Sequence, residues 1–376
     1  MSHAADHRAV RSASHQLASS NRGTCTRLVH IIITTATAIA IAIPHTDVGA
    51  QSISRDAEQY LDKALTTLER SSIHRKTFDW KSLRDSVSLW AAGATTPEAT
   101  WPALLRAVRF VDPHGFLVTP RPMPQSAYRD AMPRAAQPSR PSFPETESAL
   151  IGRVGLLVVP GFTGNNRPGF VDSLQQSIRE FDKAGACGWI VDLRFNPGGN
   201  MWPMLAGIGP LLGTQRVGAF VSANGTVEEW HYRGGQAWAG DFPPPPDARN
   251  GVAGSASKSA HRLQKSDAPV ALLLSRTTAS SGEAVAVAFL GRPNLRAFGD
   301  STAGMNSANG RFPLSDGAQI FTPYSMNRDR RGRTYALTIV PDELVSWDED
   351  SDTDAPLERA KSWLLEQPHC ASTGKK

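Results

Sequence analysis

Three short apolar runs, each followed by a segment with helical spacing, constrain the fold of this chain more than any other feature. The runs cover residues 154–159, 188–193 and 270–274. Uninterrupted apolar runs of this length are typical of strands buried on both faces, and the helical segments supply the crossovers that parallel strands need. The pattern therefore predicts an α/β fold with a layered core. No repeat at a solenoid period is present in the sequence.

The segment before this core has a different pattern. Apolar residues recur at helical spacing near 60–68, 80–90 and 101–108, which predicts three short helices and a helical cap over residues 51–119. Residues 120–147 are rich in proline and lack apolar periodicity, so we interpret them as a linker or long surface loop. We expect the α/β core to occupy residues 148–368.

Residues 1–50 have the order of features found in a secretory signal. Four arginines precede an apolar run from Leu28 to Ile43, and the small residues Val48-Gly49-Ala50 follow. The apolar run is short and Thr-rich for a transmembrane span, and an uncleaved anchor is the alternative. No later segment has the length and apolarity to cross a bilayer. The mature protein, starting near Gln51, is therefore expected in the periplasm or secreted.

Charge and cysteine content exclude some functions and leave one question open. The formal net charge is +5, of which four Arg and two Asp in residues 1–50 supply +2, so no nucleic-acid signature is present. The one dense basic run, residues 328–333, lies between strand-like segments and is interpreted as a solvated hairpin tip. Cys187 and Cys370 could pair in an oxidising compartment. The apolar surroundings of Cys187 fit a buried free thiol at least as well.

Common catalytic signatures are missing from the sequence. It contains no HExxH, no GxxxxGK[ST], no GxGxxG after a strand and no GxSxG. Their absence argues against the usual metalloprotease, nucleotide-binding and α/β-hydrolase interpretations. Three loops at the ends of apolar elements remain as candidates, at residues 112–115, 192–200 and 278–283.

Ser280 lies in the sequence Thr-Ala-Ser-Ser-Gly-Glu between a predicted strand and a predicted helix. A serine at such a turn exposes its side chain, and the backbone N–H groups after it are unpaired and can hold an oxyanion. Ser280 and Glu283 also match a capping box, which needs no catalysis. For this segment alone, capping is the commoner role.

The other two loops supply groups that could complete a site. Gly198 and Gly199 let the backbone approach a ligand closely, although an ordinary strand-to-helix turn uses the same residues. Five histidines lie beyond residue 50, and His114 is the one in a Gly/Pro-shaped turn between apolar elements, where a base could be fixed. A packed turn residue is the alternative for His114.

Together these segments resemble peptidase family S41, the C-terminal processing or tail-specific peptidases. Residues 188–199 resemble the strand and D-L-R-x-N-P-G-G turn of that family, and residues 278–283 resemble its S-x-x-E nucleophile segment. Residues 299–304 resemble its G-E-x-T-x-G loop. Asp112-Pro113-His114 resembles the D-x-H segment of members with a histidine base, such as those similar to the tricorn core and the nisin-resistance protease.

The final hairpin and V-x-P-D turn of the family are matched by Asp316-Gly317 and Val340-Pro341-Asp342, so the resemblance covers residues 56–366. It implies a crotonase/ClpP-like layered α/β core with an N-terminal helical cap, acting on a peptide or protein substrate without a metal or organic cofactor. The implied site residues are Ser280 as nucleophile, His114 as base, the N–H groups of Gly199, Gly198 and Ser281 as oxyanion hole, and Glu283, Thr302 and Asp112 as supporting residues.

Two positions depart from the family pattern. Met305 stands where many members have a lysine base, and Tyr335 stands where the histidine-using members often have a glutamate. A PDZ module is also absent, because residues 120–147 are too few to form one. The sequence therefore predicts an exported serine peptidase with a Ser–His dyad. A binding protein that has lost catalysis and an esterase or amidase of small substrates are the alternatives.

Overall fold

The computed structural model describes residues 52–131, 146–164, 166–213, 215–241, 260–347, 351 and 353–371. The chain divides into two units, residues 1–49 and 50–376, and every element named below belongs to the second. The predicted secretory signal lies outside the described residues. Within the described part, no helix combines the length and apolarity that a membrane span requires.

A six-stranded sheet forms the centre of the α/β core, with strand order β13-β9-β8-β4-β3-β2. Its strands are β2 (Glu147–Ile151), β3 (Val154–Val158), β4 (Gly188–Asp192), β8 (Val270–Leu274), β9 (Leu295–Gly299) and β13 (Glu343–Leu344). Neighbours from β13 to β3 are parallel, and β2 pairs antiparallel with β3. The three predicted apolar strands are β3, β4 and β8, so the predicted α/β fold is confirmed.

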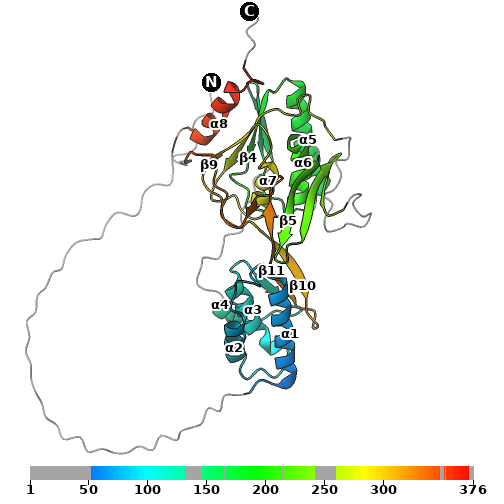
Figure 1. Ribbon diagram of the computed structural model, residues 1–376, viewed down its shortest axis with the longest axis vertical. Helices are drawn as coiled ribbons and strands as arrows, with labels where there is room; N and C mark the ends of the chain where they lie inside the picture. The colour runs from blue at the N-terminus through cyan, green and yellow to red at the C-terminus, as the bar shows by residue number, and fades with distance from the viewer. Residues whose placement is uncertain are drawn as a thin grey trace, which may run out of the picture. The chain divides into compact units, whose positions relative to one another are not determined.

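Helices cover both faces of this sheet. Helices α5 (Arg167–Lys183), α6 (Met201–Leu212) and α7 (Ser281–Phe289) lie on one face, and α8 (Ala355–Glu366) lies on the other (Figure 1). Alternate residues of β4 face opposite sides of the sheet. Trp189 and Val191 pack with the α5–α7 layer, whereas Ile190 packs with Leu364 of α8. Because successive strand residues point to opposite faces, burial on both faces requires the unbroken apolar runs in the sequence.

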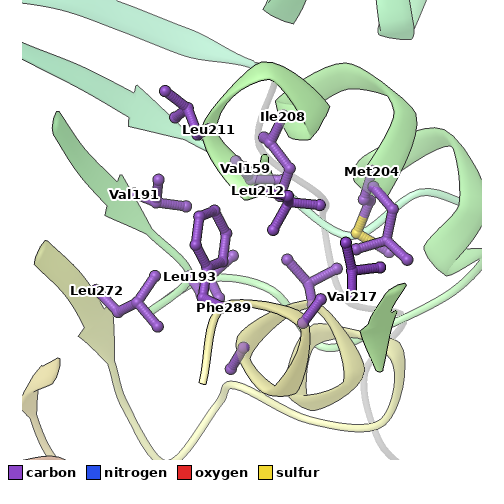
Figure 2. Packing of buried hydrophobic residues seen from close by; sticks show 14 of the residues in the cluster. Val159, Val191, Leu193, Met204, Ile208, Leu211, Leu212, Val217, Leu272 and Phe289 are labelled. Carbon is purple, nitrogen blue, oxygen red and sulfur yellow. The ribbon is translucent and has the colours of Figure 1, made fainter. Parts of the chain in front are cut away.

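Figure 2 shows the larger of these layers from close by. Val191 and Leu272 project from the sheet toward Ile208 and Leu211 of α6 and Phe289 of α7, and all five are fully buried. Burying each such side chain contributes about 1.5–3 kcal/mol. This packing fixes α6 and α7, whose first residues carry the candidate site, against the ends of β4 and β8.

A second sheet has seven strands in the order β1-β11-β5-β6-β7, with β10 and β12 also pairing with β11. Its strands are β1 (Phe116–Val118), β5 (Gln215–Ser222), β6 (Val227–Arg233), β7 (Gln236–Ala239), β10 (Ser307–Pro313), β11 (Gln319–Arg328) and β12 (Thr334–Tyr335). The β5–β6 hairpin turns at Asn224-Gly225, and Gly225 has a φ of 89° that suits glycine.

The three predicted N-terminal helices are present as α1 (Arg55–Ser71), α2 (Trp80–Trp90) and α3 (Trp101–Val111), with a short 3₁₀ turn at Glu98–Thr100. Their buried side chains share a hydrophobic cluster with Leu117 of β1 and Ile320 of β11. The first half of β11 therefore packs with the helices, while its second half pairs with β5. A short helix, α4 (Gln125–Ala131), lies in the segment predicted to be a linker, and residues 132–145 lie outside the described part.

After the basic run 328–333, only Thr334–Tyr335 form a strand, β12. Past β12 the backbone turns toward the loop that follows β9. The Ile339 N–H donates to Thr302 Oγ1 (2.8 Å), and Asn306 Nδ2 donates to the Leu337 carbonyl (2.8 Å). These loop contacts satisfy the backbone groups that a strand partner would otherwise satisfy.

A disulfide bond joins Cys187 to Cys370, so the alternative of a buried free thiol at Cys187 is wrong. The bond links the residue before β4 to the turn after α8 across 183 residues of sequence. Oxidised cysteine pairs of this kind persist in oxidising compartments.

The basic run 328–333 forms the β11–β12 hairpin tip, but the tip is not wholly solvated. Arg330 turns inward and donates to the Leu212 carbonyl (3.1 Å) and the Ala288 carbonyl (2.6 Å), in the last turns of α6 and α7. Helix C-termini present unpaired carbonyls that favour cations. The arginine therefore has a local structural role, which the prediction of a solvated tip did not include.

Candidate active site

Ser280 is the residue immediately before α7, in the loop that leaves β8. Its backbone has φ 52° and ψ −119°, and Asn294 is the other non-glycine residue with positive φ in the described part of the chain. Such a conformation costs on the order of 1–3 kcal/mol and persists when neighbouring contacts enforce it. The neighbouring contacts here are Thr278 Oγ1 donating to the Leu193 carbonyl (2.8 Å) and the Ala279 N–H donating to the Asn196 carbonyl (3.0 Å).

Glu283 is fully buried beneath this turn and accepts five hydrogen bonds. Oε2 accepts from the Ser280 N–H (3.1 Å) and the Met305 N–H (2.6 Å), and Oε1 accepts from Thr302 Oγ1 (2.5 Å), the Gly304 N–H (2.9 Å) and Asn306 Nδ2 (3.0 Å). Burial raises the pKa of Glu283, and these donors oppose the rise. Glu283 therefore joins the serine turn to the loop 302–306.

Gly198 and Gly199 lie directly against the serine turn, with φ values of 110° and 109°. A Cβ on Gly198 would come within 2.9 Å of the Ser280 Cβ, and a Cβ on Gly199 would come within 2.3 Å of the Phe162 carbonyl oxygen. Neither position can hold a larger residue without moving backbone. Ser281 Oγ donates to the Gly199 carbonyl (2.5 Å), which fixes the two loops to each other.

The backbone N–H groups at this contact differ in whether they already donate to a protein acceptor. The Gly198 N–H donates to Asn196 Oδ1 at 3.0 Å. Within the described residues, the N–H groups of Gly199 and Ser281 donate to no protein acceptor. Two free amides beside one serine are the arrangement that an oxyanion requires.

A cavity of about 290 Å³ opens beside the serine. The residues that line it are Gly199, Asn200, Met201, Trp202, Phe220, Ser280, Ser281, Ala284, Ser307, Ala308, Asn309 and Asn327. They come from the loops after β4 and β8, from α6 and α7, and from β5, β10 and β11 of the seven-stranded sheet. The cavity can therefore hold a small segment of substrate against Ser280.

His114 lies in an exposed turn between α3 and β1. Its N–H donates to Asp112 Oδ1 (2.8 Å), while Asp112 Oδ2 lies 3.3 Å from His74 Nε2. β1 pairs Phe116 with Phe321. Two residues further along β11, the Pro323 carbonyl accepts a hydrogen bond from the Ile73 N–H (2.9 Å).

The structure thus brings six of the predicted site residues together, and they are Ser280, Gly198, Gly199, Ser281, Glu283 and Thr302. His114 and Asp112 lie on the segment between the helices and β1, and no hydrogen bond joins His114 to Ser280 in the described structure. Catalytic hydrogen bonds are often long or unformed before substrate binds.

Met305 and Tyr335, the two departures from the family pattern, both make hydrogen bonds to buried or partly buried carboxylates. Met305 contributes its backbone N–H to Glu283. The Tyr335 hydroxyl donates to Asp329 Oδ2 at 2.9 Å, and burial together with this carboxylate raises the pKa of Tyr335 well above its usual value. A buried phenol held in this way is unsuited to act as a base.

Sequence reasoning does not identify four residues that contact the predicted site residues or line the cavity. They are Asn196, which holds Gly198; Asn306, which contacts Glu283; Asn327, which lines the cavity; and His74, which pairs with Asp112. Asn196 falls inside the 192–200 segment, so the motif there could have identified it. The others come from segments that carry no motif of their own.

Comparison with known proteins decides the family. The family model for Peptidase family S41 matches residues 153–345, just over half of the 376 residues. The chain belongs to peptidase family S41. It is 25% identical over 289 residues to a nisin-resistance protein from Lactococcus lactis subsp. lactis, and the match covers 76% of this chain and 82% of that protein.

Solved structures agree with the fold of this S41 peptidase. A lipoprotein from Streptococcus agalactiae superposes with a TM-score of 0.59 at 22% identity, covering 83% of this chain and 96% of that one. The photosystem II D1 C-terminal processing protease superposes with a TM-score of 0.52 at 14% identity, covering 78% and 93%. The predicted family, the α/β fold and the assignment as a serine-type peptidase are confirmed.

Proposed function

We propose that this S41 peptidase is exported, and that it cleaves peptide bonds by attack of Ser280 on the substrate carbonyl with His114 as general base. The observation that carries the proposal is the strained turn at Ser280, which lies at the start of α7 beside two unoccupied amides. Strained backbone conformations that neighbouring contacts enforce cluster at active sites.

In the proposed reaction, Ser280 Oγ forms a bond to the carbonyl carbon as His114 takes its proton. The N–H groups of Gly199 and Ser281 stabilise the tetrahedral oxyanion, and His114 returns the proton to the leaving amine. Water then hydrolyses the acyl-enzyme by the same steps. A positioned base contributes ~10²–10⁴-fold, and one oxyanion donor contributes ~10²–10³-fold. Because the Gly198 N–H is already bonded to Asn196, the donor role rests on Gly199 and Ser281.

Two observations support His114 as the base. The side chain of Met305 is a thioether, which cannot accept a proton from serine, and the Tyr335 hydroxyl is bound to Asp329. The turn that carries His114 is fixed by the Asp112 carboxylate, and β1 runs from it along β11, the strand that carries Asn327 of the cavity. The predicted supporting role of Asp112 is thus to hold this turn.

Export is supported by the signal-like residues 1–50 and by the disulfide between Cys187 and Cys370. Sequencing the N-terminus of the protein recovered from its source cells should begin at or near Gln51. Recovery of a chain that begins at Met1 in the cytoplasm would exclude export.

Kinetics of two neighbouring serine variants test the nucleophile. Ser280→Ala should lose nearly all peptide turnover while it folds normally. Ser281→Ala should keep much of it, because the proposal uses its backbone N–H. The reverse order would identify the wrong serine. Wild-type protein that binds peptides without cleaving them would favour the inactive binding protein, for which the Met305 and Tyr335 departures are the motivating observations.

A further inference from the structure

The turn that carries His114 connects α3 to β1, and the side chain of Asp112 closes it. Asp112 Oδ1 accepts a hydrogen bond from the His114 N–H at 2.8 Å, and the Asp112 carbonyl accepts one from the Gly115 N–H at 2.9 Å. The first of these bonds is made to the backbone of the proposed base itself. The direction in which the His114 imidazole projects therefore depends on the orientation of the Asp112 carboxylate.

The second oxygen of this carboxylate meets the side chain of His74. His74 Nε2 lies 3.3 Å from Asp112 Oδ2, and an ionised carboxylate can only accept, so Nε2 carries the hydrogen. The Asp112 side chain is 13% exposed and the His74 side chain is 38% exposed. Among the described residues, no other side chain forms a hydrogen bond with Asp112. His74 is thus the group that sets the rotation of the carboxylate.

His74 is itself held by the backbone of the turn between α1 and α2. Its N–H donates to Ser72 Oγ at 3.0 Å, and its carbonyl accepts from the Thr77 N–H at 2.9 Å. One residue before it, the Ile73 N–H donates to the Pro323 carbonyl of β11 at 2.9 Å. The imidazole of His74 therefore extends from a backbone that is bonded to β11.

β11 also borders the cavity beside Ser280. Pro323 pairs with Asn309 of β10, and both Asn309 and Asn327 line that cavity. The strand that holds the turn of His74 is therefore a strand of the cavity wall.

The turn of His114 is attached to the same strand at a second point. Phe116, two residues after His114, pairs with Phe321 of β11, and their rings stack with centroids 4.4 Å apart. Phe321 and Pro323 thus hold the turn from two neighbouring positions on β11, one through β1 and the other through His74. Two attachments restrict the rotation of a turn, whereas one leaves it free to pivot. A base is effective when neighbouring contacts hold its orientation.

We propose that His74 is a positioning residue for the peptidase reaction: it orients the Asp112 carboxylate, which holds the His114 backbone and so fixes the direction of the imidazole. The inference rests on the proposed role of His114 as general base and adds the residue that positions it. His74 does not line the cavity, so it should affect kcat rather than substrate binding.

Peptide hydrolysis by variants of His74 tests this role. His74→Leu removes the donor and should lower kcat about tenfold with KM within about twofold, because a displaced base still acts, whereas its removal costs at least ~10²-fold. His74→Gln keeps a side-chain N–H donor and should stay within about threefold of the wild-type kcat. His369→Leu is the matched control, since His369 Nε2 lies 3.2 Å from Asp267 Oδ1 and neither residue lines the cavity. It should keep the wild-type kcat.

A double-mutant cycle with His114 separates positioning from folding. If His74 acts through His114, adding His74→Leu to His114→Ala should change kcat by less than about twofold. A His74 that only stabilises the fold would lower kcat by the same factor in both backgrounds. The melting temperature of each variant checks that it is folded, and His74→Ala replaces His74→Leu if the leucine variant does not fold.

Three results would overturn the positioning role and leave the proposed dyad in place. They are equal losses in the two backgrounds, wild-type turnover in His74→Leu, and a His74→Gln variant that is no more active than His74→Leu. Wild-type turnover in His114→Ala would instead refute the base assignment in the proposed function, and the role of His74 would fall with it.

Discussion

Replacing Glu283 by glutamine removes one acceptor oxygen from a buried group that receives five hydrogen bonds. In the more favourable orientation the remaining oxygen keeps the three donors of Oε1, and the new NH2 group faces the N–H groups of Ser280 and Met305. Two buried donors then lose their acceptor. At about 1–3 kcal/mol for each, Glu283→Gln should reduce the free energy of unfolding by about 2–6 kcal/mol.

The same substitution should also lower activity, since the contact it breaks at the Ser280 N–H helps to hold the strained turn. Urea denaturation followed by fluorescence gives the free energy of unfolding, and peptide hydrolysis on the folded fraction gives kcat. Glu366→Gln, on the exposed end of α8, is the control and should stay within about 0.5 kcal/mol of the wild type.

A cost below about 1 kcal/mol for Glu283→Gln would refute this reasoning. It would mean that the group is protonated in the folded protein, where glutamine is a close mimic.

Two further changes test the roles of other residues. Tyr335→Phe should cost about 1–3 kcal/mol through the lost bond to Asp329 and should leave kcat within about twofold in a peptide assay. Reduction of the Cys187–Cys370 bond, or its replacement by two serines, should lower the free energy of unfolding by about 2–5 kcal/mol, which denaturation with and without reductant measures.

The elements that could be predicted from the sequence are those whose burial is visible in the pattern of apolar residues. β3, β4 and β8 are buried on both faces, and α6 starts and ends where its apolar spacing does. β10, in contrast, has Phe312 as its one large apolar side chain among small and polar residues, so the sequence contains only a weak strand signal over Ser307–Pro313. The segment after β12 reads as a strand because its residues are β-branched, but its backbone is satisfied by the loop at Thr302.

The residues of the candidate site likewise fall into those that local sequence patterns mark and those that they do not. Ser280, Gly198 and Gly199 stand in local turns, and their proximity follows from adjacent parallel strands ending at one edge of the sheet. Asn306 and Asn327 act through long-range contacts, and no local pattern marks them. The sequence does not decide whether Cys187 and Cys370 pair. The two cysteines are 183 residues apart and meet only when α8 packs on the sheet.

The rate and site of labelling by a fluorophosphonate probe test the Ser280–His114 dyad most directly. Peptide mapping by mass spectrometry should place a single adduct on Ser280 in the wild type, and none in Ser280→Ala. In His114→Ala the rate of labelling should fall at least ~10²-fold while the melting temperature stays close to that of the wild type, because the exposed imidazole contributes a base rather than packing. An adduct on Ser281, or labelling of His114→Ala at the wild-type rate, would contradict the dyad.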